Sequence, residues 1–350
     1  MAKRWRVGMV GLGHWYSAYG LARALPEYTK AELVAVACPD REKLDAFADT
    51  FHLDRHEDYR SLLERDDIDV VQIVPPVSEI PSCTILAAET GKHIILGKPM
   101  AMTLAEADRM VEAVERTGVV CLPFQGIMRL RYAGLKEQVA RGDVGDLVLM
   151  HQKARWSIAE DWYRSGTPGW FADPRYVPGG ALIDEGIYWM DFFRWLAGSE
   201  VVEVEARTAN LVHKDIGVED WGLAIFAFAS GVTATLEASW TINAPRKTGP
   251  SPKQNSVHRL EVIGTRGEII DQRPGTPGRA ILAAGAESWV FEQPAGELFG
   301  PPVPGPLDHL ITCIESGTEP VETIREARDT FVVAMAAYES ARTGRPVRPA

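Results

Sequence analysis

The stretch Val7-Gly8-Met9-Val10-Gly11-Leu12-Gly13-His14 decides the fold of this chain. An apolar run ends in Gly-x-Gly, and a helix-like segment follows it. A second apolar run, residues 33–37, ends just before Asp40. This order predicts a strand-turn-helix-strand unit that binds a dinucleotide, because Gly11 permits a tight turn and Gly13 lets the backbone approach a pyrophosphate at the positive end of the helix.

The motif is incomplete, because the third glycine position of the Gly-x-Gly-x-x-Gly pattern carries Tyr16. A lone Gly-x-Gly also occurs in turns that bind nothing. An ordinary structural turn is therefore the alternative interpretation of these residues, and the choice depends on the rest of the chain.

Composition narrows the class of protein. The chain has 350 residues, of which 46% are hydrophobic, and this predicts one or two folded domains. The formal net charge of −11 argues against a nucleic-acid partner, and the lack of a long apolar stretch argues against a membrane partner. The four scattered cysteines have no metal-ligand spacing and are typical of reduced thiols, which predicts a cytoplasmic protein without a metal site.

Residues 1–124 alternate strand and helix signals. The expected strands lie at residues 7–10, 33–37, 68–74, 93–96 and 119–122, with helices between them. Thr103 and Glu106 have the spacing of a capping box at the start of the last of these helices. Such alternation predicts an α/β dinucleotide-binding domain with a doubly wound parallel sheet, the Rossmann arrangement. Ligands bind at the carboxyl ends of such strands, where Gly11, Cys38, Pro75 and Lys98 stand.

The pattern changes after about Phe124. Longer strand signals follow at residues 146–156, 201–212, 221–228, 232–240, 258–263 and 268–271. Helices are expected at residues 132–140, 181–196, 307–316 and 323–342, and surface loops at 243–255 and 273–306. Residues 125–350 are therefore predicted to form an α+β domain with a mostly antiparallel sheet that binds substrate and forms oligomers.

Several short motifs in a fixed order carry a family resemblance. They are Gly11-Leu12-Gly13, Val74-Pro75-Pro76, residues 88–93 leading into Lys98-Pro99, residues 142–145, 179–191 and 264–267. With these motifs the chain resembles, over nearly its whole length, the glucose-fructose oxidoreductase/inositol dehydrogenase/rhizopine catabolism (Gfo/Idh/MocA) family. The resemblance implies an NAD(P)-dependent oxidoreductase that transfers hydride between a nicotinamide and a secondary alcohol or ketone of a sugar, glycoside or cyclitol.

Four positions depart from the family pattern. Gly97 replaces the usual Glu before Lys98, and Cys38 replaces the acidic residue that often ends the second strand. The His that commonly follows the paired prolines is absent near residues 78–80. Tyr188 replaces the usual His, although glucose-fructose oxidoreductase and dihydrodiol dehydrogenase in this family also place Tyr there. The departures leave cofactor preference and substrate identity open.

The resemblance implies a set of cofactor contacts. These are Gly11, Leu12, Gly13, His14, Trp15, Asp40, Arg41, Pro75, Lys98 and Gln125. Asp40 would accept a ribose hydroxyl, which favours NAD, whereas Arg41 would contact a 2′-phosphate, which favours NADP. We expect NAD, with NADP as the alternative.

Lys98, Asp184 and Tyr188 are the expected catalytic residues. Asp184 and Tyr188 lie one helical turn apart, so one stripe of a helix carries both. A free phenol has a pKa of about 10, and we expect the Lys98 ammonium to lower it so that Tyr188 can act as the base. Lys98 as the base itself is an alternative. If the resemblance is set aside, the alternative interpretation is structural: a lysine in a turn, a carboxylate in the first turn of a helix and a tyrosine in the core.

The expected substrate-binding residues are Arg129, Trp156, Trp162, Asp184 and Tyr188. Aromatic rings suit the C–H faces of a sugar, and cations suit its hydroxyls. Such residues are more often core aromatics and solvated charges, and that is the alternative here.

Two other functions stay open at this point. The fold also suits a non-catalytic, nucleotide-sensing binding protein, and the absence of Glu before Lys98 favours it. An enzyme that uses NAD transiently for elimination, epimerisation or glycoside cleavage would carry the same residues. The presence of Lys98, Asp184 and Tyr188 together favours an enzyme over a sensor.

The second sheet predicts association between subunits. Leu223 and Ile225 point to one face of the strand at 221–228, and Ala224 and Phe226 point to the other. Both faces are apolar, so both should be buried. Members of the family commonly pair such sheets, which implies a homodimer or homotetramer.

Overall fold

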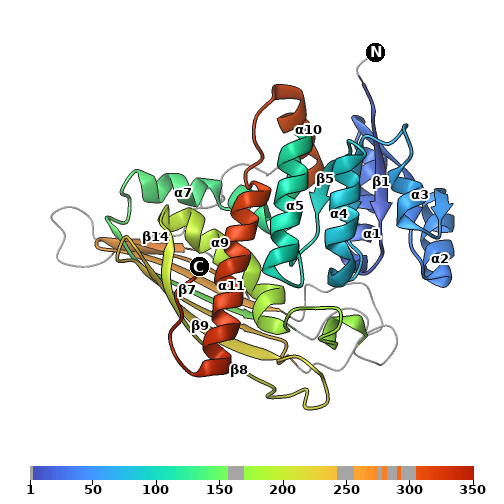
Figure 1. Cartoon of the computed structure of the whole chain (residues 1–350). Helices are drawn as coiled ribbons and strands as arrows, with labels where there is room; N and C mark the ends of the chain where they lie inside the picture. Colours follow the sequence, from blue (N-terminus) through green and yellow to red (C-terminus); the bar gives the residue numbers. More distant parts are fainter. Residues whose placement is uncertain (1–2, 157–168, 243–255, 274–277, 282–289, 293–304) are drawn as a thin grey trace.

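The computed structural model describes residues 3–156, 169–242, 256–273, 278–281, 290–292 and 305–350. Two sheets organise these residues, one parallel and one mostly antiparallel (Figure 1). The predicted combination of α/β and α+β architecture is confirmed.

The first sheet has six strands, all paired in parallel. Their order is β3 (Asp54–His56), β2 (Ala31–Ala37), β1 (Trp5–Val10), β4 (Val70–Ile73), β5 (His93–Leu96) and β6 (Cys121–Pro123). This is the Rossmann strand order. Successive strands are added outward from β1 on one side and from β4 on the other, and a crevice opens at the carboxyl ends of these two strands.

Helices cover both faces of this sheet. One face packs against α3 (Tyr59–Leu63), α4 (Ile80–Glu89) and α5 (Leu104–Thr117), and the other against α1 (Trp15–Ala24), α2 (Arg41–Phe51) and α10 (Pro306–Ser316). The expected capping box at the start of α5 is present, with Thr103 and Glu106 each bonding the other's backbone N–H. Helix α10 comes from the far end of the chain, yet its Leu310 joins the core of the first sheet.

The second sheet has eight strands. Their order is β14 (Val290–Glu292), β13 (Gly278–Ile281), β12 (Gly267–Arg273), β11 (Val257–Gly264), β7 (Leu147–Arg155), β10 (Thr233–Ser239), β9 (Trp221–Phe228) and β8 (Val201–Ala209). Only β7 and β10 pair in parallel among these strands. Strands β13 and β14 correct the expected surface loop over 273–306, and the loop expected at 243–255 lies outside the described residues.

Two long helices, α9 (Ala181–Ala197) and α11 (Ile324–Thr343), cover one face of the second sheet. Helix α11 also contacts α5, so it lies between the two halves of the molecule (Figure 1). The helix expected at 132–140 is α7 (Ala133–Ala140), and the short helix α6 (Ile127–Arg131) precedes it. Short 3-10 turns are η1 (Leu25–Glu27), η2 (Val77–Glu79), η3 (Phe124–Gly126) and η4 (Trp170–Ala172). None of the described helices is long and apolar enough to cross a membrane.

The other face of the second sheet is open. On β9, Ala224 and Phe226 are buried against the helices, whereas Leu223 and Ile225 are 37% and 41% exposed. The predicted division of this strand into two faces is confirmed. Within a single chain, however, only one of its two apolar faces is buried.

Gly11 and Gly13 let the turn after β1 touch the turn after β4. Gly11 has φ +84°, and a Cβ there would lie 2.5 Å from the backbone of Pro75. A Cβ on Gly13 would lie 2.7 Å from the Pro75 carbonyl carbon and 2.8 Å from the nitrogen of Pro76. The two glycines are therefore required for the packing of the crevice itself, as well as for access to it.

The first testable consequence concerns Gly13→Ala. The new methyl group meets backbone rather than a flexible side chain, so we expect the free energy of unfolding to fall by about 1–3 kcal/mol. Gly20→Ala is a matched control in α1, because a Cβ there meets nothing within 4 Å. That control should gain about 0.5–1 kcal/mol from helix propensity. Urea unfolding of both variants measures the difference, and equal stability would contradict the close-packing argument.

Candidate active site

The candidate site lies where the crevice of the first sheet meets helix α9 of the second half. Lys98 follows β5 at the carboxyl edge of the parallel sheet, beside the turns that end β1 and β4. Asp184 and Tyr188 come from α9. The structure thus brings together all three residues predicted to be catalytic, from segments far apart in sequence.

Lys98 and Asp184 form a buried ion pair. Their residues are only 3% and 4% exposed. The Lys98 Nζ donates to the Asp184 carbonyl oxygen at 2.9 Å and also to its Oδ1. The second carboxylate oxygen, Oδ2, accepts a hydrogen bond from Trp240 Nε1 at 3.1 Å. Both oxygens of the buried carboxylate are therefore satisfied, as a desolvated charge requires.

The start of α9 is anchored by Glu219, and this anchor sets the position of Asp184. The Glu219 carboxylate accepts hydrogen bonds from the N–H groups of Gly180 at 2.9 Å and Leu182 at 3.0 Å. The Tyr338 hydroxyl donates to the same carboxylate at 2.7 Å. A carboxylate at a helix N-terminus satisfies otherwise free donors and complements the helix dipole.

The charge of Lys98 follows from this arrangement. Burial alone would lower its pKa, but the carboxylate of Asp184 outweighs that effect, and Tyr16, Tyr188 and Glu185 add to it. The pKa of Lys98 is consequently raised well above its ordinary value. Lys98 is an ammonium at neutral pH, which argues against the alternative in which it is the base.

Tyr188 requires a correction. The sequence analysis expected Lys98 to lower the phenol pKa, and its Nζ does lie 5.1 Å from the centre of the Tyr188 ring. Burial nevertheless raises the pKa of Tyr188 to about 12, because it outweighs both Lys98 and a hydrogen bond with Tyr16, which lower it. The expected sign of the net shift was therefore wrong, while the expected effect of Lys98 has the right direction.

Gly97 gives a structural reason for one departure from the family pattern. A Cβ at this position would lie 2.6 Å from the carbonyl oxygen of Ile73, at the end of the neighbouring strand. A glutamate in the same backbone conformation would collide there. The glycine is thus matched to the close approach of β4 and β5 immediately before Lys98.

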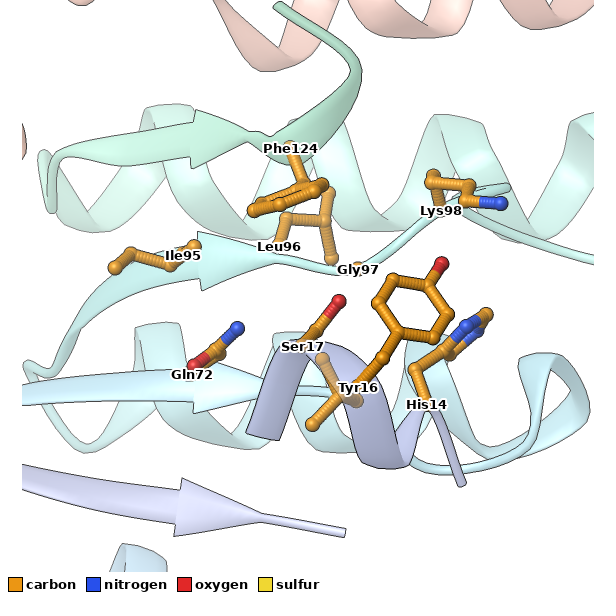
Figure 2. A pocket seen from close by; sticks show the side chains of 10 residues that line it. His14, Tyr16, Ser17, Gln72, Ile95, Leu96, Gly97, Lys98 and Phe124 are labelled. Carbon is orange, nitrogen blue, oxygen red and sulfur yellow. The ribbon is translucent and has the colours of Figure 1, made fainter. Parts of the chain in front are cut away.

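A small pocket joins the turn after β1 to Lys98. Figure 2 shows His14, Tyr16 and Lys98 converging on one side of it, with Phe124 and Gly97 on another. Tyr16 occupies the third glycine position of the motif, and its side chain lines the same pocket as Lys98. Its hydrogen bond with Tyr188 makes Tyr16 a member of the site that the sequence did not predict.

The turn after β1 fits the pyrophosphate of NAD. Gly11 and Gly13 remove side chains from the approach, and Leu12 is buried beneath it. The first turn of α1, which begins at Trp15, carries no acidic residue, so no like charge opposes a phosphate. Pro75 packs directly against both glycine positions and so holds this turn in place. The residues present therefore suit the group that the motif predicts.

The end of β2 has the features of a ribose site. Asp40 caps α2 by accepting the N–H of Lys43 at 3.2 Å, and its side chain stays half exposed. Arg41 is 78% exposed and lies 3.9 Å from Asp45 and 3.8 Å from Glu57. Cys38 is buried, which raises the pKa of its thiol. A carboxylate is thus available for a ribose hydroxyl, and Arg41 is already surrounded by acids.

Gln125 and Arg129 belong to one buried polar network. Gln125 donates to the buried Glu322 at 2.9 Å. Arg129 forms a two-pronged pair with Asp191, at 2.9 Å and 2.5 Å, and bonds Glu326 at 2.7 Å. All three nitrogens of the Arg129 guanidinium donate into this network. This placement gives Arg129 a structural role in place of the substrate contact that the sequence predicted.

The remaining predicted contacts are Trp156 and Trp162. Trp156 is partly buried against the main core, and its backbone N–H donates to the Ser239 carbonyl oxygen at 2.8 Å. Trp162 lies outside the described residues. In the described part of the chain, no group of three or more His, Cys, Asp or Glu side chains is placed to hold a metal ion.

Comparison with known proteins assigns the family. Residues 5–124 match the model of the oxidoreductase family with an NAD-binding Rossmann fold, and residues 132–270 match the GFO/IDH/MocA C-terminal domain. The scyllo-inositol 2-dehydrogenase (NAD(+)) of Bacillus subtilis (strain 168) is 30% identical, over 98% of this chain and 96% of that protein. The chain belongs to the GFO/IDH/MocA oxidoreductase family.

Other relatives of this GFO/IDH/MocA protein include sugar dehydrogenases. D-apiose dehydrogenase of Paraburkholderia graminis is 28% identical, over 99% of this chain and 90% of that protein. A solved levoglucosan dehydrogenase in complex with NADH superposes with a TM-score of 0.83, at 23% identity, over 99% of this chain and 100% of the other. At that identity the structural likeness shows the shared fold.

The site generates a prediction for Asp184→Asn. Without the carboxylate, burial becomes the main influence on Lys98, and its pKa should fall below the ordinary value of 10.5. Breaking a buried pair costs about 3–5 kcal/mol. A depressed lysine pKa makes the unfolded state bind more protons, so the stability of the variant should rise with pH up to the ordinary lysine pKa of 10.5. In the wild-type chain the raised pKa adds stability that is lost only above pH 10.5.

Urea unfolding at several pH values measures this slope. Asp108→Asn is the control, since Asp108 forms an exposed pair with Arg328 at 2.7 Å. The control should lose about 0–1 kcal/mol and gain no slope. A wild-type-like pH dependence in Asp184→Asn would show that Lys98 keeps its charge without this partner.

Proposed function

We propose that this protein is an NAD-dependent dehydrogenase or reductase that acts on a secondary alcohol or ketone of a sugar, glycoside or cyclitol. The observation that carries the proposal is the buried Lys98–Asp184 pair beside Tyr188, at the edge of a dinucleotide-binding crevice. The names of the relatives support the substrate class. A sensor would have no use for a desolvated ion pair next to a buried phenol, so the site favours an enzyme.

Each residue has a separate task in this reaction. When bound, NAD supplies the hydride acceptor for oxidation. The Lys98 ammonium hydrogen-bonds the reacting oxygen, and Asp184 holds Lys98 in place and keeps it charged. Because its pKa is raised to about 12, Tyr188 is a phenol at neutral pH, and it donates this proton to the reacting oxygen during reduction. In oxidation its phenolate accepts the hydroxyl proton. The hydrogen bond with Tyr16 and the charge of Lys98 both stabilise its phenolate against burial.

The cofactor contacts complete the proposal. Gly11, Leu12, Gly13, His14, Trp15 and Pro75 form the turn and wall for the pyrophosphate, Asp40 accepts a ribose hydroxyl, and Lys98 and Gln125 lie near the nicotinamide. The availability of Asp40 and the acids around Arg41 favour NAD over NADP. Asp184, Tyr188 and Trp156 remain the proposed substrate contacts.

We also propose that residues 1–124 form the dinucleotide-binding domain and residues 125–350 the substrate and oligomer domain. The open face of the second sheet supports a homodimer or homotetramer, because it exposes Leu149, Leu223 and Ile225. The net charge of −11 supports the absence of a nucleic-acid partner. Four free, buried cysteines support a reducing, cytoplasmic location.

The reaction is tested with scyllo-inositol, myo-inositol, D-apiose and levoglucosan, each with NAD and with NADP, followed at nicotinamide absorbance. We expect turnover of at least one polyol, with NAD preferred. Tyr188→Phe should lower turnover by about 10²–10⁴-fold, because it removes only the proton-transfer group. Lys98→Met should lower it at least as much. NADH affinity of Tyr188→Phe, measured by fluorescence, should stay close to that of the wild-type chain.

Two results would overturn these assignments. Near-normal turnover by Tyr188→Phe would reduce the tyrosine to a packing residue. No turnover of any polyol, with NADH still bound, would favour the sensor.

The oligomer proposal has its own test. Ile225→Asp places a charge in the centre of the open face, and we expect this variant to be monomeric in light scattering at micromolar concentration, while the wild-type chain is a dimer or tetramer. Leu211→Asp is the control, since Leu211 is 51% exposed in the connection between β8 and β9. A monomeric wild-type chain would contradict the proposal.

A further inference from the structure

His14 has a buried nitrogen without a hydrogen-bond partner. The residue is 1% exposed, and among the described residues its Nε2 has no partner. Leaving a buried polar atom unpaired costs about 1–3 kcal/mol, so such an atom requires an explanation. His14 lines the pocket that also contains Lys98, and both side chains lie on the same side of it (Figure 2).

Aromatic rings surround His14. The centre of its ring lies 5.1 Å from Trp170, 5.4 Å from Phe171 and 6.0 Å from Tyr16. The indole Nε1 of Trp170 is also buried without a partner among the residues that the structure describes. Two unpaired nitrogens therefore lie on adjacent rings, one from the dinucleotide-binding turn and one from 3-10 turn η4.

The charge state of His14 narrows the chemistry of a ligand. Burial, and then the positive charge of Lys98, lower the pKa of His14 well below its ordinary value. The imidazole is therefore neutral, with one nitrogen that donates and one that accepts, whereas the indole only donates. A hydroxyl can accept from the indole and donate to the imidazole at the same time. A carboxylate or ketone oxygen can only accept, so it fits one of the two imidazole tautomers, whereas a hydroxyl fits both.

The size of the pocket agrees with a single hydroxyl. Its free volume is about 10 Å³, which is close to what one water-sized group requires. Trp170 does not line this pocket but packs edge-on against the His14 ring at its margin.

We propose that His14 and Trp170 hydrogen-bond a substrate hydroxyl next to the carbon that is oxidised. The inference rests on the proposed dehydrogenase function and makes the dinucleotide-binding turn part of the substrate site. The substrate, rather than the cofactor ribose, is the favoured source of the hydroxyl for two reasons. Trp170 comes from the second half of the chain, and Lys98, which bonds the reacting oxygen in the proposed reaction, lines the same pocket as His14.

The test uses the polyol of the panel that is turned over fastest, together with its monodeoxy analogues. We expect His14→Leu and Trp170→Phe each to raise KM for the parent polyol by about tenfold, because one hydrogen bond is lost. One deoxy analogue should bind wild type and both variants equally, because it lacks the hydroxyl concerned. His14→Gln places a polar amide where the imidazole was, so it should recover part of the affinity for the polyol that His14→Leu loses.

Two controls separate binding from folding. Trp195→Phe makes the same chemical change in α9, where Trp195 packs against Phe192, and it should leave KM unchanged. The dissociation constant of NADH, measured by fluorescence without any substrate, should be unchanged in Trp170→Phe and Trp195→Phe, which lie outside the proposed cofactor contacts. If His14→Leu does not fold, Trp170→Phe and His14→Gln carry the comparison.

Several results would overturn the inference. An unchanged KM in the variants would do so, and so would an equal loss with every deoxy analogue, which indicates packing alone. A weaker NADH affinity in Trp170→Phe would assign the nitrogens to the cofactor ribose, and a crystal structure with substrate that shows only an ordered water between them would assign them to solvent. If the wild-type chain turns over no polyol, the proposed function fails and this inference fails with it. An active enzyme with an insensitive KM overturns the inference alone.

Discussion

The buried ion pair between Lys98 and Asp184 is the interaction on which the rest of the site depends. It joins the end of a strand in the parallel sheet to a helix of the second half, and both partners are almost fully removed from water. Desolvation of two charges is repaid only where geometry is good and every remaining polar atom is satisfied. Trp240, which donates to the second carboxylate oxygen, and the Asp184 carbonyl, which accepts from Lys98, meet that requirement. The pair therefore fixes the cleft geometry and holds a cation where an oxygen is expected to react.

The sequence predicted the features that depend on local order. Alternating strands and helices, the capping box at Thr103 and the two-faced pattern of β9 all follow from periodicities of a few residues. The stripe that carries Asp184 and Tyr188 is also local, because residues four apart share one helix face. The grouping of these two with Lys98 came from the family resemblance, and the structure places them together.

Other features could not be predicted because they depend on contacts between distant segments. Glu219 lies 39 residues from the Gly180 N–H that it accepts, and no local pattern links the two. The predicted direction of the pKa shift of Tyr188 was wrong for a related reason. The effect of a neighbouring charge can be guessed from a motif, but the cost of burial depends on the whole surrounding core. Arg129 was predicted to contact substrate because no local pattern reveals its buried partner Asp191, which lies 62 residues away in the sequence.

Tyr16 shows how a departure from a motif can carry information. At this position a glycine allows close packing of helix against strand, and the tyrosine looks at first like a defect of the fingerprint. Its side chain instead lines the pocket beside Lys98 and hydrogen-bonds Tyr188. Helix α1 therefore carries, within its first turn, both the end that faces the pyrophosphate and a group that stabilises the phenolate. A rigid helix that holds both makes the alignment of cofactor and base depend on one element, so displacement of α1 would disturb binding and proton transfer together.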